Sequence, residues 1–153
     1  MIRARVITCS DSAARGERED QSGPAVRALL IAQGYEAGEI IIVPDDIDAI
    51  ATAIKAAEER LIVTTGGTGI AARDVTPEAT LTVCERVIPG FGEVMRASAP
   101  MAALSRAQAA VRGTALVVNL PGSERGATES LDAVLHLIPH ALALLAGNTK
   151  HAE

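Results

Sequence analysis

The chain has 153 residues, of which 48% are hydrophobic and 22% charged, and its formal net charge is −5. These values are typical of one globular domain, here residues 1–153, with a core of fair size. There is no Trp and only one Tyr and one Phe, so the core must be aliphatic. Without a basic patch or aromatic stacking platform, nucleic acid is not expected as a partner.

The cysteines and the apolar runs bear on the compartment. Cys9 and Cys84 lie far apart and lack metal-ligand spacing, and we interpret Cys9 as a small core residue. Residues 1–9 indicate a strand rather than a secretory signal. The apolar runs 115–118 and 141–146 are too short to span a bilayer. We therefore expect a reduced, cytoplasmic protein that makes no membrane contact.

The first part of the chain indicates a strand, a polar loop and a helix. Residues 4–8 form an apolar, partly β-branched run typical of a strand. Residues 11–21 are loop-like, and we interpret the charged run 17–20 as a solvated loop rather than a site. Ser22-Gly23-Pro24 predicts a helix start, and Gly34 predicts its end.

A second strand is expected over residues 39–43, followed by Pro44, Asp45 and Asp46. A helix follows, with apolar residues at helical spacing from Ile47 onward. One of the two aspartates should cap this helix. A single cap does not need two adjacent carboxylates, so Asp45 stays open between a capping and a functional role.

The next strand, residues 61–65, runs into a loop rich in glycine and threonine. Glycines allow close approach of the backbone to a ligand, and successive free N–H groups can cradle a phosphate. Thr65 and Thr68 add hydroxyl donors, and Asp74 adds a carboxylate suited to Mg²⁺. The loop is neither a Walker A loop nor a dinucleotide-binding turn. It predicts a site for a phosphorylated ligand.

Beyond this loop, Thr76 and Pro77 predict a capped helix start. Because Thr76 is the better cap, Asp74 is left for function. Residues 89–92 predict a turn before a short helix. Residues 105–111 and 114–120 predict two strands joined by a tight reversal, the second strand fully buried.

The last helix is expected over residues 128–146, with a kink at Pro139. The three histidines, His136, His140 and His151, lie on this helix or the tail and are interpreted as surface residues. Histidine-driven catalysis is therefore not expected.

Strands alternate with helices, which predicts a mostly parallel sheet covered on both faces. Ligands bind such sheets beyond the carboxyl ends of the strands. Four polar clusters are expected there: Ser10-Asp11, Asp45-Asp46, residues 65–74 and residues 119–123. Phosphoryl or nucleotidyl transfer is the chemistry that fits such clusters, because it depends on positioning and charge neutralisation.

Several residues keep two interpretations. Arg73 either pairs with Asp74 or points to solvent, and Asn119 either ties down a loop or contacts a ligand. For Ser105-Arg106 a ligand contact is favoured slightly over an edge-strand position. The alanine- and methionine-rich stretch 97–110 is either core or subunit contact.

The motifs together resemble the molybdopterin-binding MoaB/Mog family, over nearly the whole chain. The resemblance rests on residues 64–69 with 73–79, and continues through 89–93, 104–106 and 119–122. Ser10-Asp11, residues 20–24 and residues 44–46 fit the opening and the second loop of the family. The chain departs from it at Ser12, Ser123 and Glu124.

The resemblance implies a three-layer α/β/α domain whose mixed sheet has one antiparallel strand. It implies molybdopterin adenylyltransferase activity, in which Mg-ATP and molybdopterin give adenylylated molybdopterin and pyrophosphate. Asp45 and Asp74 correspond to the acidic residues that hold Mg²⁺ and assist the transfer. The expected binding residues for nucleotide and pterin are Ser10, Asp11, Thr65, Gly66, Gly67, Thr68, Gly69, Ser105, Asn119, Pro121, Gly122 and Ser123.

The resemblance also implies a homo-trimer or homo-hexamer and a partner protein for molybdenum insertion. Two other functions stay open. The first is a non-catalytic molybdopterin-binding module, although the presence of both Asp45 and Asp74 favours the enzyme. The second is a related nucleotide or pyrophosphate hydrolase.

Overall fold

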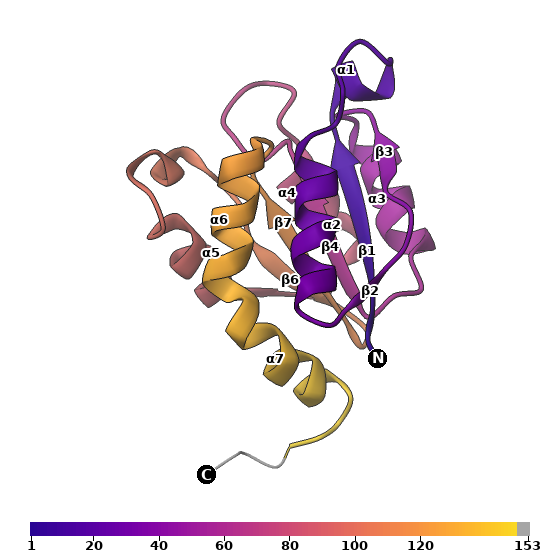
Figure 1. The fold of residues 1–153 in the computed structure, drawn as a ribbon, viewed down its shortest axis with the longest axis vertical. Helices are drawn as coiled ribbons and strands as arrows, with labels where there is room; N and C mark the ends of the chain where they lie inside the picture. The colour runs from indigo at the N-terminus through magenta and orange to yellow at the C-terminus, as the bar shows by residue number, and fades with distance from the viewer. Residues whose placement is uncertain (150–153) are drawn as a thin grey trace.

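The computed structural model describes residues 1–149. In this part of the chain one seven-stranded sheet lies between helices on both of its faces (Figure 1). Its strands are β1 (Arg3–Cys9), β2 (Glu36–Ala37), β3 (Ile41–Val43), β4 (Leu61–Thr65), β5 (Arg86–Ile88), β6 (Ala109–Arg112) and β7 (Ala115–Leu120).

The strand order is β2-β1-β4-β7-β6-β5, and β3 continues the edge by pairing with the second half of β1. The pairs β1–β2, β1–β3, β1–β4 and β4–β7 are parallel. Strand β6 runs antiparallel to both of its neighbours, β5 and β7. The prediction of a mostly parallel mixed sheet with one antiparallel strand is confirmed.

The helices cover the two faces of the sheet and complete three layers. They are α1 (Asp11–Ala14), α2 (Ser22–Ala32), α3 (Ile47–Ala56), α4 (Thr76–Val83), α5 (Pro89–Arg96), α6 (Glu124–Val134) and α7 (Ile138–Leu145), with 3₁₀ turns η1 (Pro100–Leu104) and η2 (Leu135–Leu137). Helices α2, α5, α6 and α7 lie on the face toward the viewer in Figure 1, and α3 and α4 lie behind the sheet.

Each face has its own hydrophobic core. Leu30 and Leu131 belong to the core under α2 and α6, and Ile50 and Ala79 to the core under α3 and α4. Strand β4 is buried along its whole length because both faces are covered. Each fully buried Leu or Ile side chain contributes roughly 1.5–3 kcal/mol. Apart from Tyr35 and Phe91, the side chains of the two cores are not aromatic, as predicted.

Some predicted elements have different limits. The strand expected over residues 39–43 is shorter, and a separate strand, β2, precedes it at the same edge. Residues 11–14, expected as loop, form the one-turn helix α1, in which the Ser10 side chain accepts from the Ala13 N–H. Residues 89–92, expected as a turn, already belong to α5, because Phe91 and Met95 are drawn into the core on one helical face.

The predicted cap of α4 is wrong. Thr76 is the first residue of α4, and its hydroxyl donates instead to the carbonyl oxygen of Gly66 at 2.8 Å. The last helix begins at Glu124, four residues earlier than expected, because Ser123 caps it through the Gly126 N–H. The kink expected at Pro139 is present as the 3₁₀ turn η2 just before the proline.

His136 and His140 are exposed, as expected, and His151 lies outside the described residues. Within residues 1–149, no helix combines the length and apolar character needed to cross a membrane.

Candidate functional site

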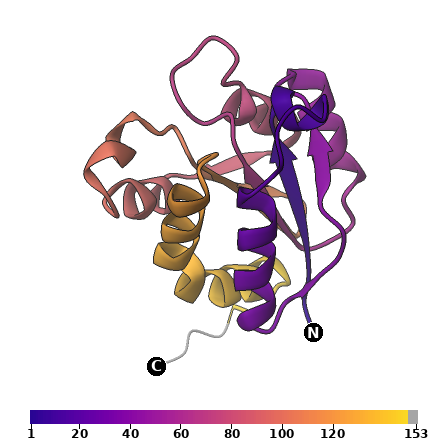
Figure 2. The same ribbon diagram turned by 45° about the horizontal axis from the view of Figure 1, so that its top comes forward.

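Strands β1, β3, β4 and β7 run parallel and end at the same edge of the sheet. Figure 2, in which this edge comes forward, shows α1 and the loop between β4 and α4 at the same end of the molecule. A cavity of about 310 Å³ opens there, called the first cavity below. It is lined by Thr8, Cys9, Ser10, Ala13, Arg18, Glu19, Asp20, Gln21, Ser22, Asp45, Thr65, Gly66, Gly67, Asp74, Gly122, Ser123 and Glu124.

The glycine loop begins in a tight junction of three strands. Gly66 has φ +90°, and a Cβ on it would lie 2.2 Å from the carbonyl oxygen of Cys9 at the end of β1. Its N–H donates to the carbonyl oxygen of Leu120 at 3.0 Å, at the end of β7. Only glycine fits this conformation and this space. The loop is thereby held against both neighbouring strands.

Three amides of this loop are free. Within the described residues, the N–H groups of Gly67, Thr68 and Gly69 donate to no protein acceptor. Gly67 also has a positive φ of +70°. Successive unpaired amides of this kind form an anion-binding concavity.

Asp45 contributes a carboxylate oxygen without a partner. Its Oδ2 accepts from the Asp11 N–H at 3.0 Å, whereas its Oδ1 is buried and makes no hydrogen bond. Burial raises the pKa of Asp45, and the nearby carboxylates of Asp11 and Asp74 raise it further. A buried polar atom without a partner calls for an explanation such as an ion or water.

Asp74 lies beside Asp45 and borders two cavities. Its Oδ2 accepts from the Ala71 N–H at 3.0 Å. A second cavity of about 300 Å³ is lined by Gly67, Thr68, Gly69, Asp74, Leu104, Ser105, Pro121 and Gly122. The two cavities therefore share Gly67, Asp74 and Gly122.

The donor set fits a cation that also binds phosphate. Among residues 1–149, no group of three or more His, Cys, Asp or Glu side chains could hold a metal. Asp45 and Asp74 supply two carboxylates, one of which has a buried oxygen without a partner. Mg²⁺ is commonly bound by one or two carboxylates, with substrate phosphates and waters completing the octahedron.

Comparisons with known proteins show the family to which the chain belongs. A family model described as a probable molybdopterin binding domain matches residues 5–140. The chain belongs to this family, the molybdopterin-binding MoaB/Mog family. A molybdopterin adenylyltransferase of Helicobacter pylori is 43% identical over 157 residues, covering 96% of this chain and 89% of the relative.

Two further relatives extend the match. The molybdopterin adenylyltransferase of Escherichia coli is 39% identical over 144 residues, covering 87% of this chain and 73% of the relative. The crystal structure of the molybdopterin biosynthesis enzyme MoaB from Thermus thermophilus superimposes with a TM-score of 0.91 at 45% identity. It covers 96% of this chain and 98% of its own. The family resemblance seen in the sequence is confirmed.

Most residues expected to bind ligand in this MoaB/Mog chain line one of the two cavities. The first cavity takes Ser10, Thr65, Gly66, Gly67, Gly122 and Ser123. The second takes Gly67, Thr68, Gly69, Ser105, Pro121 and Gly122. Glu124, one of the departures from the family pattern, also lines the first cavity and is exposed. Asp11 and Asn119 line neither cavity.

Asn119 is fully buried between secondary-structure elements. Its Nδ2 donates to the hydroxyls of Thr64 and Thr80, each at 3.0 Å. The side chain therefore ties β7 to β4 and α4 on the face of the sheet covered by α3 and α4. Its position favours the structural interpretation.

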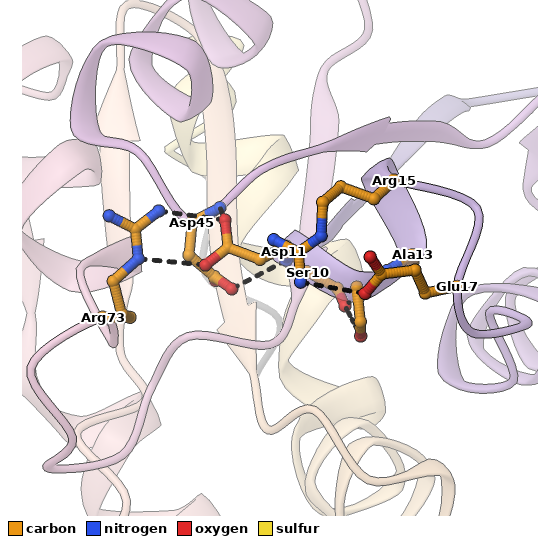
Figure 3. A network of polar contacts seen from close by, with 8 residues as sticks. Ser10, Asp11, Ala13, Arg15, Glu17, Asp45 and Arg73 are labelled. Atoms are coloured by element: carbon orange, nitrogen blue, oxygen red, sulfur yellow. Dashed lines mark hydrogen bonds and ion pairs between the residues drawn. The ribbon is translucent and has the colours of Figure 1, made fainter.

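The carboxylate of Asp11 points to Arg73 (Figure 3). The Arg73 Nε donates to Asp11 Oδ2 at 2.9 Å and its Nη2 donates to Oδ1 at 3.0 Å. This hydrogen bond from Arg73 lowers the pKa of Asp11. Arg73 thus pairs with Asp11 rather than with its neighbour Asp74.

The sequence interpretation missed the floor of the first cavity beside α2. Asp20 accepts from the Thr8 hydroxyl at 2.7 Å and from the Gly23 N–H at 3.0 Å. The Ser22 hydroxyl donates to Thr65 Oγ1 at 2.9 Å. Asp20 stands just before a helix start, and this position distinguishes it from the solvated part of the charged run.

Cys9 also borders the first cavity, but its side chain is buried. Burial raises the pKa of Cys9 to about 12. The side chain packs in the core under α3 and α4, as expected of a small core residue. Burial thus disfavours the thiolate form of Cys9, and the mechanism proposed below needs no thiolate nucleophile.

Proposed function

We propose that this chain catalyses the adenylylation of molybdopterin. A terminal phosphate oxygen of molybdopterin attacks the α-phosphorus of ATP, and the bond from that phosphorus to the oxygen bridging the α- and β-phosphates breaks. Adenylylated molybdopterin and pyrophosphate result. The observation that carries the proposal is the unpaired Oδ1 of Asp45 beside Asp74, where two cavities meet. The adenylyltransferase relatives support it.

The chain itself supplies positioning. We assign one substrate to each cavity, so that the reacting phosphates meet at the shared residues Gly67, Asp74 and Gly122. The free amides of residues 67–69 would donate to phosphate oxygens. No general base is required, because the attacking phosphate is already an anion. Holding two reactants in line supplies a large part of such a rate enhancement.

Asp45 and Asp74 would hold Mg²⁺. The ion would offset the repulsion between the two anionic substrates and the developing charge at the α-phosphate. Both carboxylates stand at fixed places: Asp45 accepts from the Asp11 N–H, and Asp74 accepts from the Ala71 N–H. This leaves Oδ1 of Asp45 for the cation.

The test is turnover with purified components. The protein, Mg-ATP and molybdopterin should yield adenylylated molybdopterin, seen by mass spectrometry, and pyrophosphate in equal amounts. Asp45→Ala or Asp74→Ala should abolish this turnover while the circular dichroism spectrum stays unchanged. Normal activity in both variants would refute the assigned roles.

Two other outcomes identify the alternatives. If calorimetry shows that molybdopterin binds but no pyrophosphate appears, the chain is a binding module. If nucleotide alone gives pyrophosphate or AMP, it is a hydrolase.

We also propose that the protein acts in the cytoplasm as a homo-trimer or homo-hexamer and passes its product to a molybdenum-insertion protein. Met101 and Leu104 support a subunit contact, because they are 74% and 53% exposed on η1. Ala107, Ala109 and Ala110 of the same stretch are buried core residues. Light scattering on the purified protein measures the assembly directly.

A further inference from the structure

Asp11 joins two loops at the edge of the sheet. Its N–H donates to Oδ2 of Asp45 at 3.0 Å, and the Asp45 N–H donates back to Oδ1 of Asp11 at 3.0 Å. This reciprocal pair connects the segment after β1 to the segment after β3 (Figure 3). It also fixes which oxygen of Asp45 is left without a partner, namely Oδ1.

Arg73 adds the third loop to this network. Its two contacts with Asp11, at 2.9 and 3.0 Å, form a two-pronged ion pair of the kind that fixes orientation as well as charge. Arg73 directly precedes Asp74 in the chain. Neither Asp11 nor Arg73 lines either cavity. The pair therefore lies behind the two carboxylates rather than among the ligand contacts.

We infer that Asp11 and Arg73 are positioning residues whose ion pair sets the separation of Asp45 and Asp74 for a shared divalent cation. This inference rests on the proposed function for its place in catalysis. It changes the expected role of Asp11 from ligand binding to positioning.

The loop that carries Asp74 needs such a restraint. Its middle is exposed, with Ile70 74% accessible. On the far side, Arg106 donates to the carbonyl oxygens of Gly69 at 2.8 Å and Asp74 at 2.7 Å. Arg73 supplies the link on the near side, toward Asp45. Arg73 also balances Asp11, which would otherwise be a third uncompensated carboxylate beside the two that bind the cation.

The pair should matter more to metal binding than to folding. Arg73 is 66% exposed, and exposed ion pairs contribute little to stability. Residues that orient metal ligands from behind typically change metal affinity or activity by roughly 10–100-fold when replaced. We expect about tenfold, the low end of that range, because the pair is partly solvated.

The experiment measures Mn²⁺ binding by electron paramagnetic resonance in the presence of α,β-methylene-ATP, which cannot transfer its adenylyl group. The variants are Arg73→Gln, Asp11→Asn, the double variant and Arg73→Lys. Arg15→Gln is the matched control, because Arg15 forms an exposed ion pair with Glu17 at 3.1 Å and does not bond to Asp45. AMP affinity is measured in parallel in EDTA, where no metal contributes.

Both single variants should bind Mn²⁺ about tenfold more weakly, and the double variant no more weakly than either, since all three break the same link. Arg73→Lys should recover part of the loss, and Arg15→Gln should match wild type. AMP affinity in EDTA should not change. An unchanged Mn²⁺ affinity in Arg73→Gln, or additive losses in the double variant, would overturn the inference. An equal loss of AMP affinity in EDTA would do so too, because it would make Arg73 a ligand contact.

The Mn²⁺ measurement needs no turnover. If wild type failed to adenylylate molybdopterin, the proposed function would fall, and the effect of Arg73→Gln on Mn²⁺ would still decide the positioning role.

Discussion

Replacing Gly66 with alanine tests the junction on which the site is built. A Cβ at this position would lie 2.2 Å from the carbonyl oxygen of Cys9 and 3.3 Å from its carbonyl carbon. Both atoms belong to the backbone of β1 and cannot rotate away. The new methyl group must therefore push β4 and β1 apart at the floor of the first cavity.

The cost has two parts. A left-handed backbone conformation costs an alanine roughly 1–2 kcal/mol, and Gly66 has φ +90°. Overpacking against atoms that cannot move aside costs roughly 1–3 kcal/mol more. Gly16→Ala is the matched control, because Gly16 has φ +72° but nothing within 4 Å of the new Cβ. Gly16→Ala should show only the cost of the left-handed backbone conformation.

Urea denaturation of both variants measures the two free energies of unfolding. Gly66→Ala should lose about 2–5 kcal/mol and Gly16→Ala about 1–2 kcal/mol. Gly66→Ala should also weaken binding of the substrate that occupies the first cavity, because Gly66 and Gly67 line it. If the two variants lost the same stability, the close approach of Gly66 to β1 would be refuted.

Three further substitutions should change the stability of the protein in different directions. Asp45→Asn should abolish turnover yet raise Tm at neutral pH. Burial raises the pKa of Asp45 above 3.8, so the charged carboxylate lowers the stability of the folded protein. The gain in Tm should vanish at acid pH, where Asp45 of the wild type is protonated. Glu59→Gln should lower the stability of the protein at neutral pH. Burial is the largest single effect and alone would raise the pKa of Glu59. The hydrogen bond from Arg5, a backbone hydrogen bond and the charges of Arg5 and Arg3 together outweigh burial and lower the pKa, so the loss should be present at neutral pH and fade as pH falls through the folded pKa. That loss should be about 1–2 kcal/mol in urea titrations, less than for a fully buried pair, since Arg5 is partly exposed. Asn119→Ala should cost about 2–3 kcal/mol in the same assay but leave AMP affinity within about twofold, and a large loss of AMP affinity would restore a binding role.

The predictable part of this fold followed from rules that act locally or through sheet topology. Alternating strands and helices require a parallel sheet, and the ends of parallel strands meet at one edge. These rules predict that Ser10, Asp45 and Asp74 lie close together, and all three line the first cavity. The expectation that one of two adjacent aspartates caps a helix is also confirmed, because Asp46 accepts from the Ala49 N–H at 2.8 Å.

Two of the wrong predictions concern residues whose partners lie farther along the chain. Thr76 has the local signature of a cap, yet its hydroxyl bonds to Gly66, ten residues earlier. Residues 89–92 contain two glycines and a proline, which locally favour a turn. The burial of Phe91 and Met95 in the core stabilises a helix there instead, and tertiary contacts routinely override such propensities.

The face that Asn119 occupies could not be known in advance. Successive residues of a strand point to opposite faces. Val117 lies in the core under α3 and α4, whereas Val118 and Leu120 lie in the other core. Asn119 shares the face of Val117, and there it meets Thr64 and Thr80. The sequence placed it at a strand end near the site, and only the packing of both layers shows that it is turned into the protein.

The arginines near the site do not by themselves explain how an acidic protein can accept two polyanions. Arg73 is bound to Asp11, and Arg106 to Glu78 and to two loop carbonyls, so both hold the loop in place. Among the described residues that line the first cavity, Arg18 is an arginine without a hydrogen bond or ion pair. One exposed guanidinium cannot balance a triphosphate and a pterin phosphate. The remaining sources of positive potential are the free amides of residues 67–69 and the cation that we propose on Asp45 and Asp74. Removal of the divalent ion should therefore weaken ATP binding far more than it weakens AMP binding. Arg18→Gln should weaken the binding of both nucleotides less than metal removal weakens ATP binding, because Arg18 is a screened surface charge.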